Sequence, residues 1–175
     1  MLKTLAIGVA ALIAAVLLFA STRPDSIRVQ RETSIKAPPE KIFPFIADFH
    51  RWVAWSPYEK KDPALKRTYG GAAQGQGAVY AWEGNHEIGQ GRMEITKVSS
   101  PSKIAIQLDF VKPFEAHNVV EFTLQPQGDA THVTWVMQGE SAYVAKLMGL
   151  FFDMDKMIGQ DFEAGLASLK TVAEQ

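Results

Sequence analysis

Histidine is the side chain most often used for proton transfer and metal binding, and this sequence contains four histidines, spaced far apart. None has the close spacing of a helical metal-binding pair such as HExxH; the four are His50, His86, His117 and His132. The absence of cysteine excludes thiolate nucleophiles and cysteine-ligated metal centres. We therefore predict no metal site, no cofactor and no catalytic set of residues.

Motifs for nucleophilic catalysis and phosphate binding are also missing. The chain has no GxSxG sequence, and the glycine-rich stretch GGAAQGQG lacks the GK[ST] ending of a phosphate-binding loop. Among the carboxylates, Asp109 and Glu121 fall on the polar sides of expected strands, whereas Glu83 and Glu115 could reach the rim of a cavity. A proton-transfer pair would need partial burial, which the sequence does not reveal.

Aromatic residues form the most unusual local cluster. The stretch HRWVAWSPYEKKDP, residues 50–63, places Trp52, Trp55 and Tyr58 close together and then becomes charged. Because Pro57 and Pro63 exclude a long helix or a strand interior, the cluster is expected near a loop. Such side chains either pack this segment onto the rest of the domain or contact an apolar ligand.

Composition is that of a folded domain without a basic nucleic-acid surface. Of the 175 residues, 47% are hydrophobic, and the net charge is −1. A chain of this length favours one domain with a sizeable core. Since Lys and Arg are not concentrated in any stretch, no nucleic-acid partner is predicted.

Residues 1–22 form the first strong structural signal. No charge lies between Lys3 and Arg23, and this run would be about 28 Å long as a helix, close to the thickness of a bilayer core. We predict an uncleaved membrane anchor, because Leu18 suits a signal-peptidase site before Ala20 poorly; secretion after cleavage is the alternative. Lys3 and the amino terminus favour a cytoplasmic N-terminus, whereas Arg23, Arg28 and Arg31 favour the opposite orientation. We predict the first orientation, which places the domain in the periplasm, outside a bacterial inner membrane.

After a linker at residues 23–26, residues 27–175 are expected to form an α+β domain. Alternation at Ile27, Val29 and Ile35 predicts a strand, and Pro38–Pro39 opens a short helix. Several segments from residue 66 to residue 140 alternate similarly and predict an antiparallel meander, with turns at Gly84–Asn85 and Gly128–Asp129. Apolar residues spaced by three and four from Leu147 to Leu169 predict one helix of about six turns.

The domain resembles a known superfamily. The segments IKAPPEKIFPFIADFHRWVAWSPY, GQGAVYAWEGN and VEFTLQPQGDATHVTWVMQGE, with the terminal amphipathic helix, are similar to the START-like SRPBCC superfamily, and most of all to its polyketide cyclase/dehydrase and lipid-transport group. The resemblance implies a helix-grip fold, in which a curved antiparallel sheet of seven strands wraps around the C-terminal helix. It also implies a hydrophobic cavity between the two.

Within this expected fold, the large side chains facing the cavity are candidate ligand contacts. They are Trp55, Tyr58, Tyr80, Trp82, Phe110, Phe122, Trp135, Met137, Met154, Met157 and Ile158. Ligand pockets are mostly apolar, and methionine adapts to apolar ligands of varied shape. A stripe with this spacing equally fits an ordinary core.

Three functions are compatible with the resemblance. The first is a membrane-anchored module that binds a lipid or another hydrophobic small molecule; the second is a cyclase or hydratase acting on such a molecule. The third is a non-catalytic interaction domain with a filled core. Because one fold serves many activities, the fold alone does not decide among them.

Overall fold

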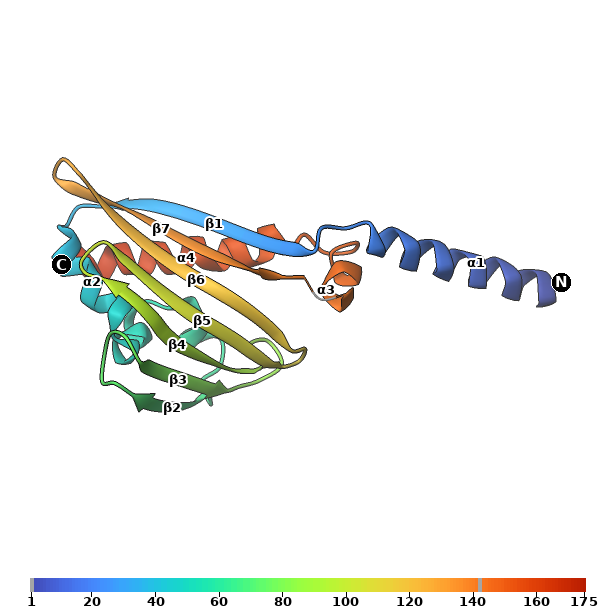
Figure 1. The fold of residues 1–175 in the computed structure, drawn as a ribbon, viewed down its shortest axis with the longest axis horizontal. Helices are drawn as coiled ribbons and strands as arrows, with labels where there is room; N and C mark the ends of the chain where they lie inside the picture. The colour runs from blue at the N-terminus through green and yellow to red at the C-terminus, as the bar shows by residue number, and fades with distance from the viewer. Residues whose placement is uncertain (1, 142) are drawn as a thin grey trace.

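The computed structural model describes residues 2–141 and 143–175, and consists of a sheet gripping a long helix, with a separate helix projecting from one end (Figure 1). The projecting helix is α1 (Leu2–Ser21). The strands are β1 (Ser26–Ile35), β2 (Lys66–Gly71), β3 (Ala78–Glu83), β4 (Gln90–Ser99), β5 (Lys103–Lys112), β6 (Ala116–Gln127) and β7 (Ala130–Glu140). The remaining helices are α2 (Pro39–Ala47), α3 (Tyr143–Met148), α4 (Met154–Ala173) and the short 3-10 helices η1 (Phe49–Ala54) and η2 (Pro57–Lys60).

The seven strands form one antiparallel sheet, as predicted, and their order is β1-β7-β6-β5-β4-β3-β2. Consecutive strands from β2 to β7 are neighbours, while β1, the first strand, pairs with β7, the last strand. The turn between β6 and β7 contains Gly128 at φ 64°, a left-handed conformation that favours glycine. The hairpin at Gly84–Asn85 is wider than a two-residue turn, because residues 84–89 form a loop in which Gly84 N–H donates to Gly89 O at 2.9 Å.

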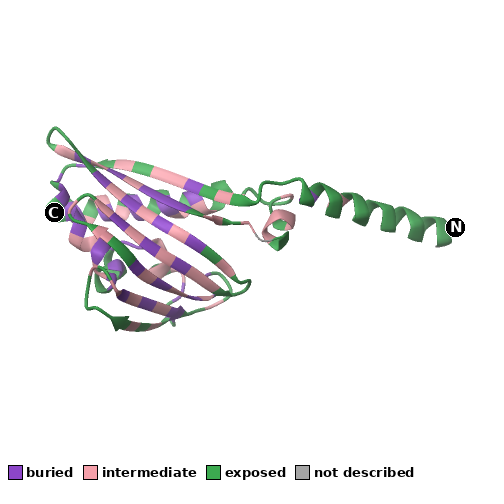
Figure 2. Ribbon diagram, in the orientation of Figure 1, coloured by how far each residue is buried: buried purple, intermediate pink, exposed green. Residues whose placement is uncertain are grey.

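The inner face of the sheet is apolar because its side chains alternate. On β5, Ile104, Ile106 and Leu108 are buried and their neighbours are half-exposed, and the same alternation runs across β3, β4, β6 and β7 (Figure 2). This two-residue period places one face against α4 and leaves the other in water. The hydrophobic effect therefore holds the curved sheet around the helix.

The terminal helix differs from the prediction at its start. We expected one helix from Leu147 to Leu169, but α3 ends at Met148 and α4 begins at Met154. Gly149 has a low helix propensity, and the Asp153 side chain accepts a hydrogen bond from Lys156 N–H at 3.0 Å, which caps a new helix. As a result, Leu147 and Phe151 are not part of the helix that the sheet grips.

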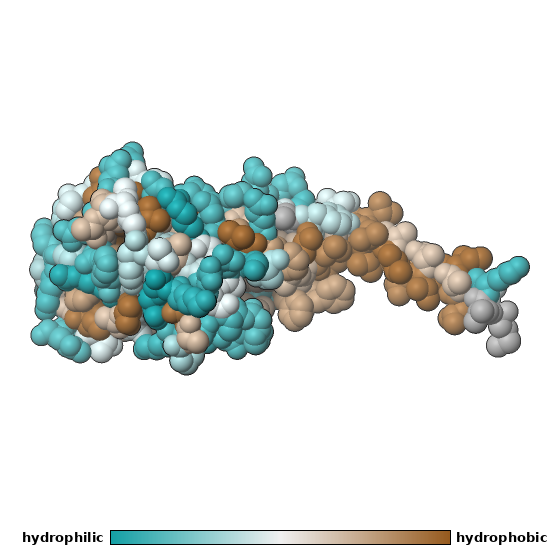
Figure 3. All heavy atoms as spheres, turned by 90° about the horizontal axis from the view of Figure 1, so that it is seen from below, coloured by the Kyte–Doolittle hydropathy of each residue, from teal (hydrophilic) through white to brown (hydrophobic). Residues whose placement is uncertain are grey.

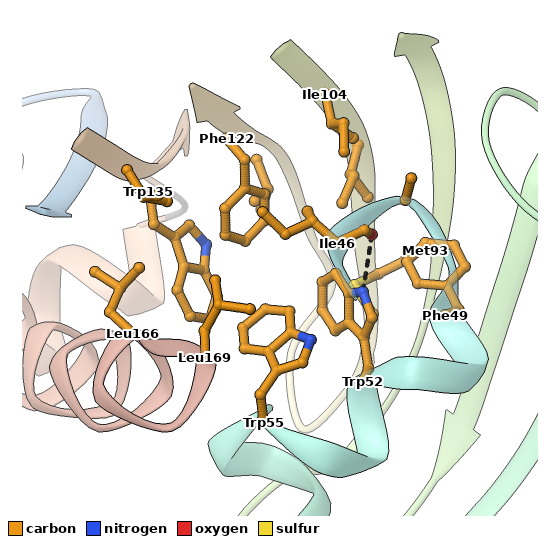
Figure 4. Packing of buried hydrophobic residues seen from close by; sticks show 14 of the residues in the cluster. Ile46, Phe49, Trp52, Trp55, Met93, Ile104, Phe122, Trp135, Leu166 and Leu169 are labelled. Carbon is orange, nitrogen blue, oxygen red and sulfur yellow. Dashed lines mark hydrogen bonds between the residues drawn. The ribbon is translucent and has the colours of Figure 1, made fainter. Parts of the chain in front are cut away.

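The short helices close one end of the domain through the tryptophans. Trp52 Nε1 donates to Ile46 O at 3.0 Å, and Trp55 Nε1 donates to Phe45 O at 2.8 Å. Their rings lie beside Phe122 and Trp135 in the buried cluster of Figure 4. Both tryptophans thus tie η1 to α2 and pack these helices onto the sheet.

Candidate functional site

A mostly apolar cavity of about 490 Å³ lies between the inner face of the sheet and α4. This volume falls within the usual range for small-molecule sites, about 300–1,000 Å³. Side chains of β3, β4, β5, β6 and β7 form one wall, α4 forms the opposite wall, and η1, η2 and the loop 84–89 contribute the rest. The gripped helix therefore leaves enough space beside it for a small organic molecule.

Most of the candidate ligand contacts predicted from the sequence lie in the wall of this cavity. They are Tyr58, Tyr80, Trp82, Phe110, Trp135, Met137, Met154, Met157 and Ile158. Their contact with a ligand remains a prediction. Trp52, which the sequence analysis left between a packing and a ligand-contact role, also lies in the wall. The structure adds several residues that the sequence did not single out: Glu59, Lys61, Met93, Leu108 and Asp161.

Trp55 and Phe122, the other two candidates, lie outside the lining. Trp55 has 0% exposure and is enclosed by Trp52, Phe122 and Trp135, with ring centroids 4.9, 6.0 and 5.6 Å away. Phe122 is likewise fully buried. These rings form the packed layer behind the cavity wall, and Trp135 in the wall stacks on Phe162, with ring centroids 4.0 Å apart.

Exposure of the lining side chains locates the mouth of the cavity. Trp135 is 2% exposed, whereas Met157 in the first turn of α4 is 53% exposed, and Glu87 in the loop 84–89 is also exposed. The mouth thus lies between the start of α4 and this loop. Asp62 positions the loop by accepting a hydrogen bond from Asn85 N–H at 2.7 Å.

One carboxylate in the cavity wall is buried and engaged on both oxygens. The Glu59 side chain is only 4% exposed; its Oε2 accepts from Arg67 Nε at 2.6 Å, and its Oε1 accepts from the Tyr80 hydroxyl at 2.7 Å. Burial, and then the hydrogen bond to Glu59, raise the pKa of Tyr80, so its phenol stays protonated and donates. Nothing in the sequence indicates this burial, because Glu59 belongs to a charged run that normally faces water.

A second polar group joins η2 to α4 at the cavity wall. Just beyond η2, Lys61 Nζ lies 2.7 Å from Asp161 Oδ2 and 5.4 Å from the centre of the Tyr58 ring. Burial, and then the Asp161 charge, raise the pKa of Tyr58 further above physiological pH, so its phenol remains protonated. The carboxylates suspected from the sequence differ: Glu83 and Glu115 are exposed and do not line the cavity.

None of the four histidines lines the cavity. His117 pairs with Asp109, His132 with Glu32, and His50 with Asp48, whereas His86 is exposed in the loop 84–89 near the mouth. Within residues 2–141 and 143–175, no group of His, Asp and Glu side chains is arranged to hold a metal ion.

Helix α1 has the length and hydropathy of a membrane span. Its apolar stretch Lys3–Ser21 has a mean hydropathy of 2.5, and nearly all of its residues are exposed to solvent. A soluble core helix would be buried instead. A membrane anchor and a signal sequence both fit this observation.

Comparison with known proteins yields one family match. Residues 26–174 match the family model for polyketide cyclase/dehydrase and lipid transport proteins. No curated protein matches the sequence.

Solved structures share the fold at low sequence identity. A Chromobacterium violaceum protein is 14% identical with a TM-score of 0.61, and the alignment covers 87% of this chain and 99% of that one. The Aha1 dimer of Colwellia psychrerythraea is 17% identical with a TM-score of 0.60, covering 85% of this chain and 96% of its own. A major latex-like protein of Panax ginseng is 10% identical with a TM-score of 0.60, covering 87% of this chain and 100% of its own. These neighbours confirm the helix-grip architecture.

Proposed function

The chain belongs to the polyketide cyclase/dehydrase and lipid transport family, and we propose that it is a membrane-anchored binding protein that holds a lipid or another hydrophobic small molecule in its cavity. The observation that carries the proposal is the mostly apolar cavity of about 490 Å³ between the sheet and α4. Apolar walls favour a ligand through the hydrophobic effect, and the few polar groups would fix its orientation.

The engagement of the polar groups favours binding over catalysis. Each oxygen of Glu59 already accepts a hydrogen bond from a neighbouring side chain, so the carboxylate links η2 to β2 and β3 as a structural part of the wall. The Tyr80 hydroxyl donates a hydrogen bond to Glu59, and Lys61 is paired with Asp161. These contacts stabilise the wall. Among the described residues, the buried indole N–H of Trp135 in the cavity wall has no hydrogen-bond partner, and we expect it to donate to an oxygen atom of the ligand.

An enzyme of cyclase or hydratase type is the second candidate, because Tyr58, Glu59 and Tyr80 all border the cavity. In that case the lone pairs of Glu59 that remain beside its bonds to Arg67 and Tyr80 would have to reach the substrate.

Helix α1 is the part of the chain that would anchor the binding domain to the membrane. An uncleaved anchor keeps the cavity near a bilayer and raises the local concentration of membrane-derived ligand. We propose that the N-terminus is cytoplasmic and the domain periplasmic, since Lys3 lies at the free end of α1. Protease added to spheroplasts should then digest the domain, and full protection would refute this orientation.

Native mass spectrometry of residues 25–175, purified from the native host without detergent, tests the binding function. We expect a discrete added mass that is lost on denaturation and identified after extraction. Val120→Phe, which fills part of the cavity, should abolish the added mass, whereas Val53→Phe at an exposed position of η1 should retain it. A protein that carries no ligand and also takes up no fluorescent fatty acid or isoprenoid would contradict the proposal.

A further inference from the structure

We propose that an exposed apolar surface beside α1 contacts the bilayer and holds the mouth of the cavity against the lipid. This surface, the neck surface, consists of Tyr143, Val144, Met148, Phe151, Phe152 and Met157. The proposal rests on the anchoring role of α1 and adds a second membrane contact to it.

The neck surface is unusually exposed for its composition. Phe151 is 74% exposed and Phe152 is 54% exposed, although both are large hydrophobic side chains. Figure 3 shows that the apolar surface of α1 continues onto the narrow region where α1 meets the body. A contiguous apolar patch of this kind is typical of an interaction site.

Contacts between α3 and α1 fix the position of α3 along the axis of α1, and therefore its depth relative to the bilayer. The Tyr143 hydroxyl donates to Leu17 O at 2.8 Å, and the two helices pack against each other. Leu17 lies four residues before the end of α1, which corresponds to about 6 Å along the helix axis. If the apolar residues of α1 are inserted to their last turn, α3 must lie at the level of the lipid headgroups.

The orientation of α3 agrees with that depth. Lys146 forms an ion pair with Asp25 of the linker, and Ser141 N–H donates to Asp25 O at 2.8 Å. These contacts direct the charged side of α3 toward the linker and leave Tyr143 and Val144 exposed. Tyrosine is enriched at membrane interfaces, where its ring meets lipid and its hydroxyl meets polar groups.

The linker is too short to lift the body away from the membrane. Residues 22–25 separate α1 from β1, and a chain of this length spans at most about 14 Å even when extended. Arg23 reinforces the junction, because its guanidinium lies 5.0 Å from the centre of the Phe19 ring. The bilayer is therefore the apolar partner that this surface meets first.

The same surface reaches the cavity. Phe151 and Phe152 immediately precede the cap of α4, and Met157 in its first turn belongs both to the neck surface and to the cavity mouth. An apolar molecule could thus move between the bilayer and the cavity without exposure to water. A second copy of the chain is the alternative partner, and the following experiment distinguishes it.

The experiment uses the full chain in phosphatidylcholine vesicles with brominated acyl chains. Because the chain has no cysteine, Phe151→Cys or Phe152→Cys can carry a single environment-sensitive fluorophore. Val53→Cys is the matched control, since Val53 is 50% exposed on η1, and Leu12→Cys in the middle of α1 reports insertion of the anchor. No ligand is needed, so the result is independent of binding in the cavity.

We expect brominated lipid to remove most of the emission at positions 151 and 152 and little of it at position 53. Quenching at Leu12 with none at Phe151 and Phe152 would overturn the inference while leaving the anchor in place. Labels at 151 and 152 that are shielded from water but not quenched would identify a second copy as the partner. Absence of quenching at Leu12 would refute both the anchor and the inference.

Discussion

Replacing Glu59 with glutamine tests whether its buried carboxylate serves as a structural part of the cavity wall. Glu59→Gln preserves the size of the side chain but replaces one charged oxygen with an amide NH₂. Since Arg67 and Tyr80 both donate to Glu59, one of the two donors then faces another donor. The side chain is only 4% exposed, so water cannot readily replace the lost partner.

Hydrogen bonds to charged groups contribute about 1.5–3 kcal/mol, and we expect Glu59→Gln to lower the free energy of unfolding by about 2 kcal/mol. For a chain of this length, that loss corresponds to a decrease in Tm of about 4–8 °C. Thermal unfolding of the full chain in detergent, followed by tryptophan fluorescence, measures the decrease. The matched control is Glu83→Gln, whose carboxylate is 62% exposed and lies 4.0 Å from Lys66 Nζ; we expect a change within about 0.5 kcal/mol.

Equal Tm values for Glu59→Gln and Glu83→Gln would refute the argument that burial makes the Glu59 contacts strong. The same variant also separates the two candidate functions. A binding protein should retain most of its uptake of a fluorescent fatty acid at temperatures well below the lowered Tm. Loss of all activity toward a substrate in a folded Glu59→Gln protein would instead support an enzyme.

Three further changes test the remaining assignments. Trp55→Ala should lower the free energy of unfolding by about 3–5 kcal/mol, because Trp55 belongs to the packed layer. The exposed control Val53→Ala should change it by no more than about 0.5 kcal/mol, measured by urea unfolding. Normal stability of Trp55→Ala with lost ligand uptake would place Trp55 in the ligand site instead. Met157→Glu should leave Tm nearly unchanged, because Met157 is exposed, and should slow the uptake of a fluorescent fatty acid, because it places a negative charge at the mouth of the cavity. Unchanged uptake would show that the ligand does not enter past Met157. The hydrogen bond from His117 to Asp109 raises the pKa of His117 above its ordinary value of 6.5. The contribution of this pair to the stability of the folded protein is therefore complete below pH 6.5 and is lost as the pH rises through the higher folded-state pKa. His117→Gln should remove this part of the pH dependence of Tm, and an unchanged profile would contradict the assignment.

The order of strands and helices follows closely from local patterns. Alternation along β1, β5 and β6 and the turn at Gly128 are set by residues near one another in the sequence. The break between α3 and α4 was missed because the apolar spacing continues from Leu147 through Phe151. The cap at Asp153 overrides that spacing, and it involves a single side chain that is common in loops as well.

Position in the cavity wall was predictable only in part. Periodicity along a strand or helix indicates which face is apolar, and it therefore identifies inner-face residues such as Tyr80 and Met154. Periodicity does not distinguish the wall from the layer behind it. Trp55 and Trp52 are three residues apart, yet only Trp52 reaches the cavity.

The sequence by itself therefore determined the fold class, the family resemblance, the apolar N-terminal segment and the lack of metal-binding and nucleophile motifs, because each depends on residue type and short-range spacing. Only the tertiary structure decided that Glu59 is buried beneath Tyr80 and that Lys61 meets Asp161, one hundred residues away in sequence. Only the tertiary structure also placed the neck surface between α1 and the cavity mouth. These features depend on which distant segments pack together, and such packing follows from the shape and burial of the whole chain.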